Sequence, residues 1–475
     1  MFSFALLALL LLAGFAEIAD IANFAMAKRL GGMGYHFVFL QRDGQVFAVG
    51  RNECGQLDIG TITNAVVLPK PMLSVTNATD VSAGVVHSCV LDQGNRINCA
   101  GYNRYYQLGD GTTEDKQTLV PVLGLDSGIE EVYCSYYSSC MRATSGKAQC
   151  WGRVAGSIET SPTTITISGG IQSISQGYAH ICFVATIGGK LYCMGDNNYG
   201  QLGTGSTSNR AALTPVVGLA TQDIVSVACG FEHTCAVNAN GAMLCWGKDA
   251  YGQLGSITSN SLVPVQVVGI THGAAVAWTG WYNSFTIMQN GTVQAFGKDG
   301  YGVFGTGSTG DQPVPIVFGQ GVSGVVEACG GYPTTCVLLQ NDQVKCTGNN
   351  LFGQLGAGNN DDSFTLVDMQ LRAAALTRLP TKKLTKAPTV EPTKTPTKAP
   401  TKKPTKTPTA APTKRPTKAP TKKPTRTPTN APTKAPTKRP TKSPTNAPTK
   451  KPTKTPTAKP TKKATLVPTK KPTPL

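Results

Sequence analysis

The hydrophobic positions of this chain fall into seven similar runs, each of which ends in a glycine. The runs read VFAVG, INCAG, AQCWG, LYCMG, MLCWG, VQAFG and VKCTG, and they end at Gly50, Gly101, Gly152, Gly195, Gly247, Gly297 and Gly348. Self-similarity with a period near 50 residues predicts one supersecondary unit repeated seven times. Each unit alone would leave an apolar sheet face in water, so we expect the copies to pack on one another.

Within one copy, the pattern predicts four short β-strands. The fifth copy reads IVSVACG, HTCAV, AMLCWG and VPVQVVG, with turn residues between the runs. Asn240-Gly241 separates the second and third runs, as expected for a tight hairpin turn. We therefore predict an all-β fold over residues 17–370, a seven-bladed β-propeller of four-stranded antiparallel blades. The alternative, an open β-solenoid, needs capping ends that the chain does not show.

A second motif follows most of the closing glycines. It reads CGQLD at 54–58, YQLG at 106–109, YGQLG at 199–203 and 251–255, YGVFG at 301–305 and FGQLG at 352–356. In the third copy RVAGSIETSP follows Gly152 instead, which accounts for the short interval of 43 residues. The motif has no GK[ST] and opens no helix, so we interpret its Leu or Phe as a plug between neighbouring blades rather than as part of a phosphate loop.

The combination of G-x-x-H-[ST]-C-A-V, CWG and N-x-x-G-Q-L-G resembles the repeat of the regulator-of-chromosome-condensation family over about residues 20–370. The resemblance implies a seven-bladed propeller. The founding members of that family are nuclear exchange factors for a small Ras-like GTPase, and many relatives are binding scaffolds.

Ten of the 14 cysteines form five equivalent pairs that flank the central hairpin of a copy. The pairs are Cys89 with Cys99, Cys140 with Cys150, Cys182 with Cys193, Cys235 with Cys245, and Cys336 with Cys346. In the first copy both members are replaced together, by Val38 and Ala48, and in the sixth by Phe285 and Ala295. Opposed residues of an antiparallel pair lie close enough for a disulfide, so we predict five disulfides; the alternative is ten buried thiols.

The fourth pair is one residue further apart than the others, so its register is less well defined by the sequence. Four cysteines have no predicted partner: Cys54, Cys134, Cys229 and Cys329. The last three share a position in the first strand of their copies, and we interpret them as buried free thiols.

The N-terminus predicts secretion. Residues 1–16 hold an apolar run too short for a membrane span, and Gly14 and Ala16 suit signal-peptide cleavage before Glu17. An uncleaved anchor or a buried first strand is the alternative. Disulfides require an oxidising compartment, so we expect the protein to be secreted or held in a cell wall or extracellular matrix. Asn77-Ala78-Thr79 and Asn290-Gly291-Thr292 are N-glycosylation sequons.

The charge is divided unequally. Residues 379–475 hold 26 of the 44 basic residues and one acid, Glu391, whereas the rest of the chain has 18 basic and 25 acidic residues. Proline recurs at every fourth position from Pro388 to Pro460, so residues 371–475 should form a disordered, extended tail. This tail could be a solvated or O-glycosylated stalk, a polycation for acidic polysaccharide or an anionic surface, or a binder of DNA phosphates.

The histidines do not suggest catalysis. His36, His87, His180 and His233 occupy one repeat position, where the other copies have Ser138, Asn283 and Thr334, so we predict a framework role. His272 lies in a loop without an evident partner. The chain has no nucleophile elbow, HExxH, phosphate loop or CxxC metal spacing. We expect no catalytic residues, cofactor or metal.

These observations favour a monomeric, secreted or cell-surface binding protein whose propeller binds a protein or glycan and whose tail is a stalk or anchor. The alternative is a guanine-nucleotide exchange factor or chromatin-associated regulator for a small Ras-like GTPase. The apolar N-terminus and the cysteine pairs favour the first hypothesis, because a reducing nucleus would leave the pairs open.

Overall fold

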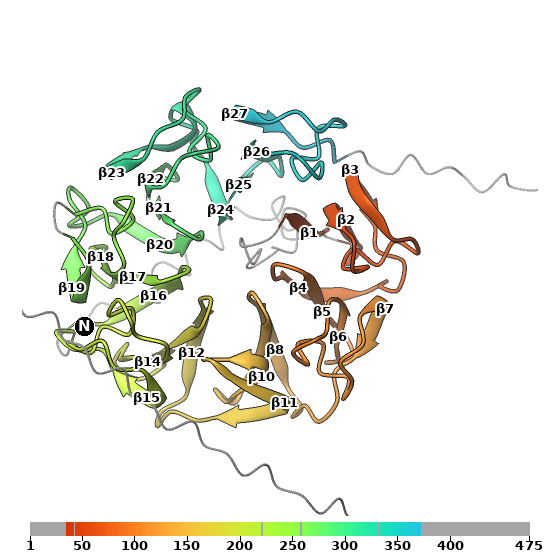
Figure 1. The fold of residues 1–475 in the computed structure, drawn as a ribbon, viewed down its shortest axis with the longest axis horizontal. Helices are drawn as coiled ribbons and strands as arrows, with labels where there is room; N and C mark the ends of the chain where they lie inside the picture. The colour runs from red at the N-terminus through yellow and green to blue at the C-terminus, as the bar shows by residue number, and fades with distance from the viewer. Residues whose placement is uncertain (1–34, 42, 220–221, 257–258, 331–332, 372–475) are drawn as a thin grey trace, which may run out of the picture. The chain divides into compact units, whose positions relative to one another are not determined.

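The computed structural model describes residues 35–41, 43–219, 222–256, 259–330 and 333–371. Within these residues, seven antiparallel sheets stand side by side in a ring (Figure 1). Six sheets have four strands and one has three, which confirms the predicted seven-bladed propeller. The predicted signal peptide and the tail from residue 372 onward lie outside the described residues.

The strands follow one another blade by blade. Blade one contains β1 (His36–Leu40), β2 (Val46–Asn52) and β3 (Thr63–Pro71). Blade two contains β4 (Ala78–Ala83), β5 (His87–Asp92), β6 (Ile97–Gly101) and β7 (Lys116–Pro121). Blade three contains β8 (Ile129–Cys134), β9 (Ser138–Ala143), β10 (Ala148–Val154) and β11 (Ser157–Ile165). Blade four contains β12 (Ile171–Gln176), β13 (His180–Ala185), β14 (Leu191–Gly195) and β15 (Arg210–Pro215).

The last three blades repeat this order. Blade five contains β16 (Ile224–Cys229), β17 (His233–Asn238), β18 (Met243–Gly247) and β19 (Ser261–Gln266). Blade six contains β20 (Ala274–Thr279), β21 (Asn283–Met288), β22 (Val293–Gly297) and β23 (Gln312–Val317), followed by the short helix η1 (Phe318–Gln320). Blade seven contains β24 (Val325–Gly330), β25 (Thr334–Leu339), β26 (Val344–Gly348) and β27 (Ser363–Asp368). In blades two to seven the first strand lies nearest the ring centre and the last at the periphery (Figure 1).

The closing glycine of each copy lies where two neighbouring strands approach each other closely. Gly247 pairs with His233, the first residue of the preceding strand, and has a φ of 104°. A Cβ at Gly247 would lie 2.6 Å from the carbonyl oxygen of Glu232 and 2.8 Å from the Cα of His233. Only glycine combines this positive φ with so close an approach, which explains why the motif recurs.

The five predicted disulfides are present with the predicted pairing. They join Cys89 to Cys99, Cys140 to Cys150, Cys182 to Cys193, Cys235 to Cys245, and Cys336 to Cys346. In each, the two cysteines are directly opposed in the central hairpin, with Cα atoms 4.0–4.1 Å apart. The alternative of ten buried thiols is therefore wrong for these positions.

The extra residue between Cys182 and Cys193 does not shift the register of blade four, because the two cysteines are still directly opposed. The residue lies in the turn of the hairpin. This turn is closed by Ala185 N donating to Lys190 O, which makes it one residue longer than the turn closed by Asn238 N and Ala242 O in blade five.

Seven hydrophobic clusters fill the seams between consecutive blades. The predicted plugs are all buried: Leu57, Leu108, Leu202, Leu254, Phe304 and Leu355. Leu202 of blade four, for example, lies in one cluster with Trp246 of blade five. Phe37 and Phe39 of blade one pack in one cluster with Cys336 and Cys346 of blade seven, so the ring is closed and the solenoid alternative is wrong.

Blade three departs from the others as its sequence indicated. β10 continues past Gly152 to Val154 and turns directly into β11, with Val154 opposite Ser157. No plug follows this glycine, and Val154, Ile165 and Ile167 fill the seam to blade four instead, in one cluster with Cys140 and Cys150. The interval of 43 residues therefore reflects a missing loop and not a missing strand.

No helix in the described part of the chain is long and apolar enough to cross a bilayer.

Candidate functional site

The repeated histidines hold neighbouring blades together. Each Nε2 lies 2.9 Å from a hydroxyl of the next blade, in the pairs His36–Ser88, His87–Ser139, His180–Thr234 and His233–Ser284. Ser284 Oγ in turn donates to the carbonyl of Gln253 at 2.7 Å, so the His233 ring must donate from Nε2. Burial lowers the pKa of all four histidines to about 3, which keeps them neutral. This arrangement is that of framework hydrogen-bonding groups, as predicted.

The tryptophan of the CWG motif reaches the same carbonyl groups. Trp246 Nε1 donates to Gln201 O at 2.9 Å, and Thr234 Oγ1 donates to this oxygen at 2.8 Å. The same pair of bonds reaches Gln107 O from Trp151 and Ser139. The recurring polar side chains of the repeat thus form hydrogen bonds between neighbouring blades. A binding surface must therefore be made by other residues.

Two residues separate the Gly and the His of the G-x-x-H motif, and they project from one end of the ring. At the first of these positions blades two to six have Val85, Tyr136, Tyr178, Phe231 and Trp281, and these side chains form one cluster. Blade three has Ser135 and Ser138 in place of the Gly and the His, and blade six has Asn283 in place of the His. The Tyr136 and Trp281 ring centroids lie 5.7 Å apart although two blades separate them in the chain. Tyr178 and Phe231 stack at 4.4 Å. The first strands surround the centre of the ring (Figure 1), so this cluster lies at the central axis.

Further aromatic side chains extend the cluster outward. Tyr137 lies 5.0 Å from Tyr105, and Tyr282 lies 5.3 Å from Tyr251 and 5.5 Å from Phe231, between ring centroids. We call this surface the aromatic face, and define it as Tyr102, Tyr105, Tyr136, Tyr137, Tyr178, Tyr199, Phe231, Tyr251, Trp281 and Tyr282. All of these except Tyr136 are partly exposed.

Cations lie against the aromatic rings. Arg153, Lys248 and Lys298 each directly follow a closing glycine. Arg153 lies 5.3 Å from the Tyr178 ring, Lys248 lies 4.4 Å from the Tyr199 ring, and Lys298 lies 4.5 Å from the Tyr251 ring. Such cation–π contacts hold the flexible basic side chains on the rings. Arg51 makes the same contact with Phe352 at the seam between blades one and seven.

Phenol and guanidinium groups give the aromatic face its polar character. Burial is the main cause that raises the pKa of Tyr137 and of Tyr282, so both phenols stay protonated at neutral pH. Glu232 is held by Lys248, with 2.6 Å between the carboxylate oxygen and Nζ. The surface therefore offers rings, hydroxyl groups and the positive charge of Arg153.

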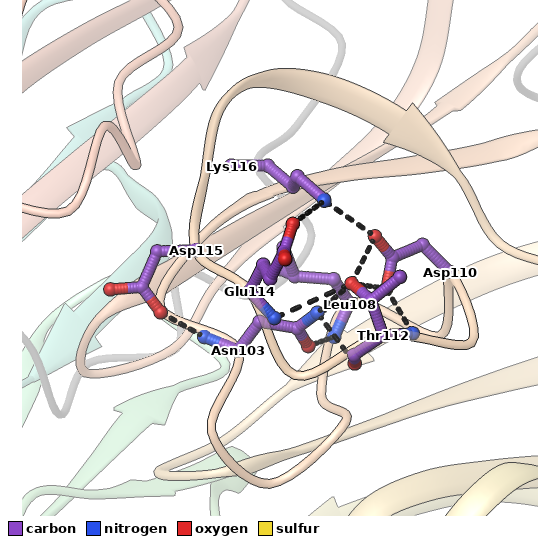
Figure 2. A network of polar contacts seen from close by, with 7 residues as sticks. All are labelled: Asn103, Leu108, Asp110, Thr112, Glu114, Asp115 and Lys116. Carbon is purple, nitrogen blue, oxygen red and sulfur yellow. Dashed lines mark hydrogen bonds and ion pairs between the residues drawn. The ribbon is translucent and has the colours of Figure 1, made fainter.

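A polar network fixes the loop that carries Tyr105 of the aromatic face. In blade two, Asn103 Oδ1 accepts from Leu108 N at 3.0 Å, and its Nδ2 donates to Asp110 Oδ1 and Thr112 O at 2.9 Å each (Figure 2). Lys116 lies between Asp110 and Glu114, with Nζ–oxygen distances of 3.5 and 3.4 Å (Figure 2). This ammonium pairs with both carboxylates and ties the loop together, so we assign the loop a structural role.

Aspartate replaces this asparagine in blades five and six. Asp249 and Asp299 accept from the backbone nitrogens of Leu254 and Phe304, as Asn103 does from Leu108. Burial raises the pKa of Asp249 to about 6 and that of Asp299 to about 7. Around neutral pH these two loops are therefore sensitive to protonation.

Among the described residues, one group brings together three side chains of the types that bind metals. The ligand atoms of His87, Cys89 and Cys134 lie within 4.8 Å of one another, and all three residues are buried. Sequence spacing did not reveal this group, because Cys134 comes from the next blade. Cys89 is bonded to Cys99, so it is not a thiolate ligand in the oxidised chain.

The remaining residues singled out in the sequence are not members of the aromatic face as defined above. Asn77 and Asn290 are exposed, and Asn290 Oδ1 accepts from Thr292 N and Oγ1 within its own turn, so glycosylation stays a prediction. His272 is exposed, with Nδ1 3.1 Å from Thr271 Oγ1. Cys134, Cys229 and Cys329 are buried free thiols as interpreted, whereas Cys54 is only partly buried. The prediction that these three share one strand position is wrong for Cys329: Cys134 and Cys229 end their strands, but Cys329 lies one residue earlier in β24 and pairs in the strand register with Cys336.

Comparisons with known proteins agree with this architecture. Two profiles of the regulator of chromosome condensation (RCC1) repeat match the chain, one at residues 43–91 and 188–237 and the other at residues 78–107, 171–201 and 224–253. The ultraviolet-B receptor UVR8 of Arabidopsis thaliana is 30% identical over 348 residues, which cover 69% of this chain and 78% of the receptor. The probable E3 ubiquitin-protein ligase HERC4 of Rattus norvegicus is 32% identical over 154 residues, which cover 30% of this chain and only 14% of that ligase.

Two solved structures share the fold. Human WBSCR16 superposes with a TM-score of 0.62 at 19% identity, covering 69% of this chain and 95% of that protein. Yeast RCC1 (Prp20), solved with Kap60 bound, also gives a TM-score of 0.62, at 16% identity and with coverage of 72% and 86%. At these identities the likeness concerns the fold alone.

Proposed function

Since this chain belongs to the regulator of chromosome condensation (RCC1) repeat family, we propose that it is a non-enzymatic binding protein whose aromatic face holds a protein partner. One observation carries the proposal. Five consecutive blades contribute partly exposed aromatic rings to a continuous surface, which joins Tyr105 of blade two to Tyr282 of blade six.

The composition of the aromatic face favours a protein partner over a glycan. Tyrosine, tryptophan and arginine are enriched where protein interfaces derive most of their binding energy. The rings of Tyr136, Tyr178 and Phe231 pack on one another, so little side-chain freedom remains to be lost on binding. The charge of Arg153 favours a partner surface that presents carboxylates.

The relatives' names do not supply an activity for this chain. One relative is an ultraviolet-B receptor, and another is a probable ubiquitin ligase that matches over only a small part of its length. A solved structure of Prp20p from Saccharomyces cerevisiae was reported with that protein's binding to Gsp1p and histones. The exchange-factor alternative rests on likeness of fold, and no contact in the described residues favours it.

We further propose that the protein acts outside the cytosol, with its basic tail as a stalk or anchor. Five disulfides support this location, because reducing compartments keep such pairs open. The apolar first 16 residues and the exposed sequon at Asn77 are consistent with secretion. Acidic polysaccharide and anionic surfaces remain the expected ligands of the tail.

The binding proposal is tested with surface variants of the full oxidised chain. Immobilised protein is exposed to the extracellular fraction of its native source, and captured proteins are quantified by mass spectrometry. We expect Tyr137→Ala with Tyr282→Ala to reduce capture of a specific protein at least about tenfold, the loss of a central interface residue. Phe364→Ala with Leu262→Ala removes exposed apolar groups of the outer strands β27 and β19 and should leave capture unchanged. Equal capture by both double variants would refute the proposal that the aromatic face binds the partner.

The location is tested separately. Mass spectrometry of the native protein should find the five hairpin pairs oxidised and a chain that begins near Glu17. Free thiols together with an intact residue 1–16 segment would favour the exchange-factor alternative instead.

A further inference from the structure

The seam between blades two and three holds a free thiol beside a disulfide. Cys134 is the last residue of β8 in blade three, and the Cys89–Cys99 disulfide joins β5 and β6 in blade two. The Sγ atoms of Cys134 and Cys89 lie within 4.8 Å of each other and of a ring nitrogen of His87. The three cysteines are buried and share one hydrophobic cluster with Leu108 and Trp151.

Hydrogen bonds across the seam hold this group in place. Ser82 of blade two accepts from Cys134 N at 2.9 Å, which fixes the backbone of the free cysteine. Ser139 Oγ lies 2.9 Å from His87 Nε2 and 3.8 Å from Cys89 Sγ. The framework of the ring therefore holds the thiol of Cys134 close to the Cys89 sulfur of the disulfide.

We propose that Cys134 and the Cys89–Cys99 disulfide form a thiol–disulfide exchange pair that can convert a bond within blade two into a covalent link between blades two and three. The Cys134 sulfur attacks Cys89 Sγ, a bond between these two sulfurs forms, and the bond from Cys89 to Cys99 breaks. Cys99 leaves as a thiolate and takes up the proton that Cys134 released. The numbers of thiols and disulfides do not change, so no oxidant or reductant is consumed.

The burial of Cys134 sets the rate of this exchange. Only the thiolate attacks a disulfide, and burial raises the pKa of Cys134 to about 12. The titratable neighbours are His87 on β5, which is neutral, and Asp80 on β4, whose charge raises the pKa of the thiol further. The exchange is therefore slow at neutral pH and accelerates about tenfold per pH unit as the thiolate fraction rises.

The consequence is mechanical. Before exchange, noncovalent contacts such as the Ser82 and His87 hydrogen bonds hold this seam. After exchange, a sulfur bridge spans it, and the hairpin of blade two has lost its own bridge. Such a step would lock one seam of the ring while releasing the Cys99 thiol.

Peptide mapping of the full oxidised chain tests the proposal. The protein is incubated at pH 6, 8 and 9, quenched with acid, alkylated under denaturing conditions and digested with trypsin without reduction. The tryptic peptide Ile97–Arg104 contains Cys99 as its sole cysteine. We expect it to become free and alkylated, faster at higher pH, while the Cys89 peptide becomes linked to the peptide that contains Cys134.

Two variants make the result specific. Cys134→Ala should abolish release of Ile97–Arg104, whereas Cys229→Ala, a matched substitution of a buried free thiol at the same repeat position in blade five, should leave it unchanged. A wild-type chain whose Ile97–Arg104 peptide stays disulfide-linked at every pH would overturn the proposal. Equal release from the Cys134→Ala chain would also overturn it. The cross-linked peptide is sought in the wild-type protein, so this readout does not depend on how the variants fold.

Discussion

The ring of His233 occupies the space in which a side chain at Gly230 would stand. A Cβ built on Gly230 would overlap Cε1 and Nδ1 of His233 and would lie 2.8 Å from the carbonyl oxygen of Gly280 in the next blade. The same relationship joins Gly84 to His87 in blade two, where the Cβ would lie 2.7 Å from Cε1. The G-x-x-H motif is thus a steric pair, in which the glycine makes room for a buried imidazole.

Substituting Gly230 should therefore destabilise the ring without any change of backbone preference. We expect Gly230→Ala to lower the free energy of unfolding by about 1–3 kcal/mol, the usual effect of overpacking a core. Gly300→Ala is the matched control, because that glycine is exposed and its nearest neighbour, Lys298 Cε, is 3.9 Å away. Urea titration followed by fluorescence measures both variants, and equal midpoints would contradict the steric role.

Acid should destabilise the propeller through its buried histidines. Their folded pKa of about 3 lies below the ordinary value of 6.5, so the unfolded chain binds more protons between these values. The stability that the neutral histidines provide is complete above about pH 6.5 and falls as the pH decreases toward 3, by about 1.4 kcal/mol per pH unit for each histidine. Asp249 and Asp299 act in the opposite direction but are fewer.

The histidine contribution is measured by urea titrations at pH 4.5, 5.5, 6.5 and 7.5. His233→Asn copies the residue that blade six has at this position, Asn283. We expect this variant to lose stability at pH 7.5 but to show a shallower decline in acid than the parent chain. An unchanged slope would mean that His233 is not responsible for the acid sensitivity.

Asp299 should limit stability at alkaline pH. Its pKa of about 7 lies above the ordinary value of 3.8, so the stability that its neutral form provides is lost as the pH rises through 7. We expect Asp299→Asn to raise the melting temperature more at pH 8.5 than at pH 5.5. The reciprocal change, Asn103→Asp, should lower it at pH 8.5, because Asn103 Nδ2 donates to Asp110 and to Thr112 O. Calorimetry at the two pH values decides the outcome.

The seam plug Leu202 should be among the most sensitive apolar positions. It is fully buried between blades four and five, so Leu202→Ala should lower the free energy of unfolding by about 2–5 kcal/mol. Leu262→Ala on β19 removes a side chain that is 37% exposed and serves as the control. A small effect at Leu202 would show that the seam can collapse around the lost side chain.

Each hairpin disulfide should contribute independently of the others. Cys235→Val with Cys245→Ala copies the pair of Val38 and Ala48 in blade one and removes one bridge. Closing a loop of this length is worth about 2–3 kcal/mol in the chain-entropy description, so we expect a loss of that size in urea. The difference from the parent chain should shrink when both proteins are unfolded under reducing conditions.

Much of this fold follows from the sequence because the seven copies serve as an internal alignment. Paired replacement of the two cysteines in the first and sixth copies indicated the disulfide partners, and the missing plug after Gly152 indicated the unusual third blade. The aromatic face was not identified from the sequence. Its central residues lie at the variable positions of G-x-x-H, and aromatic enrichment there at Tyr136, Tyr178, Phe231 and Trp281 is the feature that could have revealed it.

The sequence by itself determined the number of blades, the strand pairing within each blade and the sulfur bridges, because all of these are contacts between residues close together in one copy. Closure of the ring decided the rest. It brought Tyr136 against Trp281 across two intervening blades and placed Cys134 beside a disulfide of the preceding blade. Contacts between blades depend on how each sheet packs on the next, and the spacing of residues within a repeat does not contain that information.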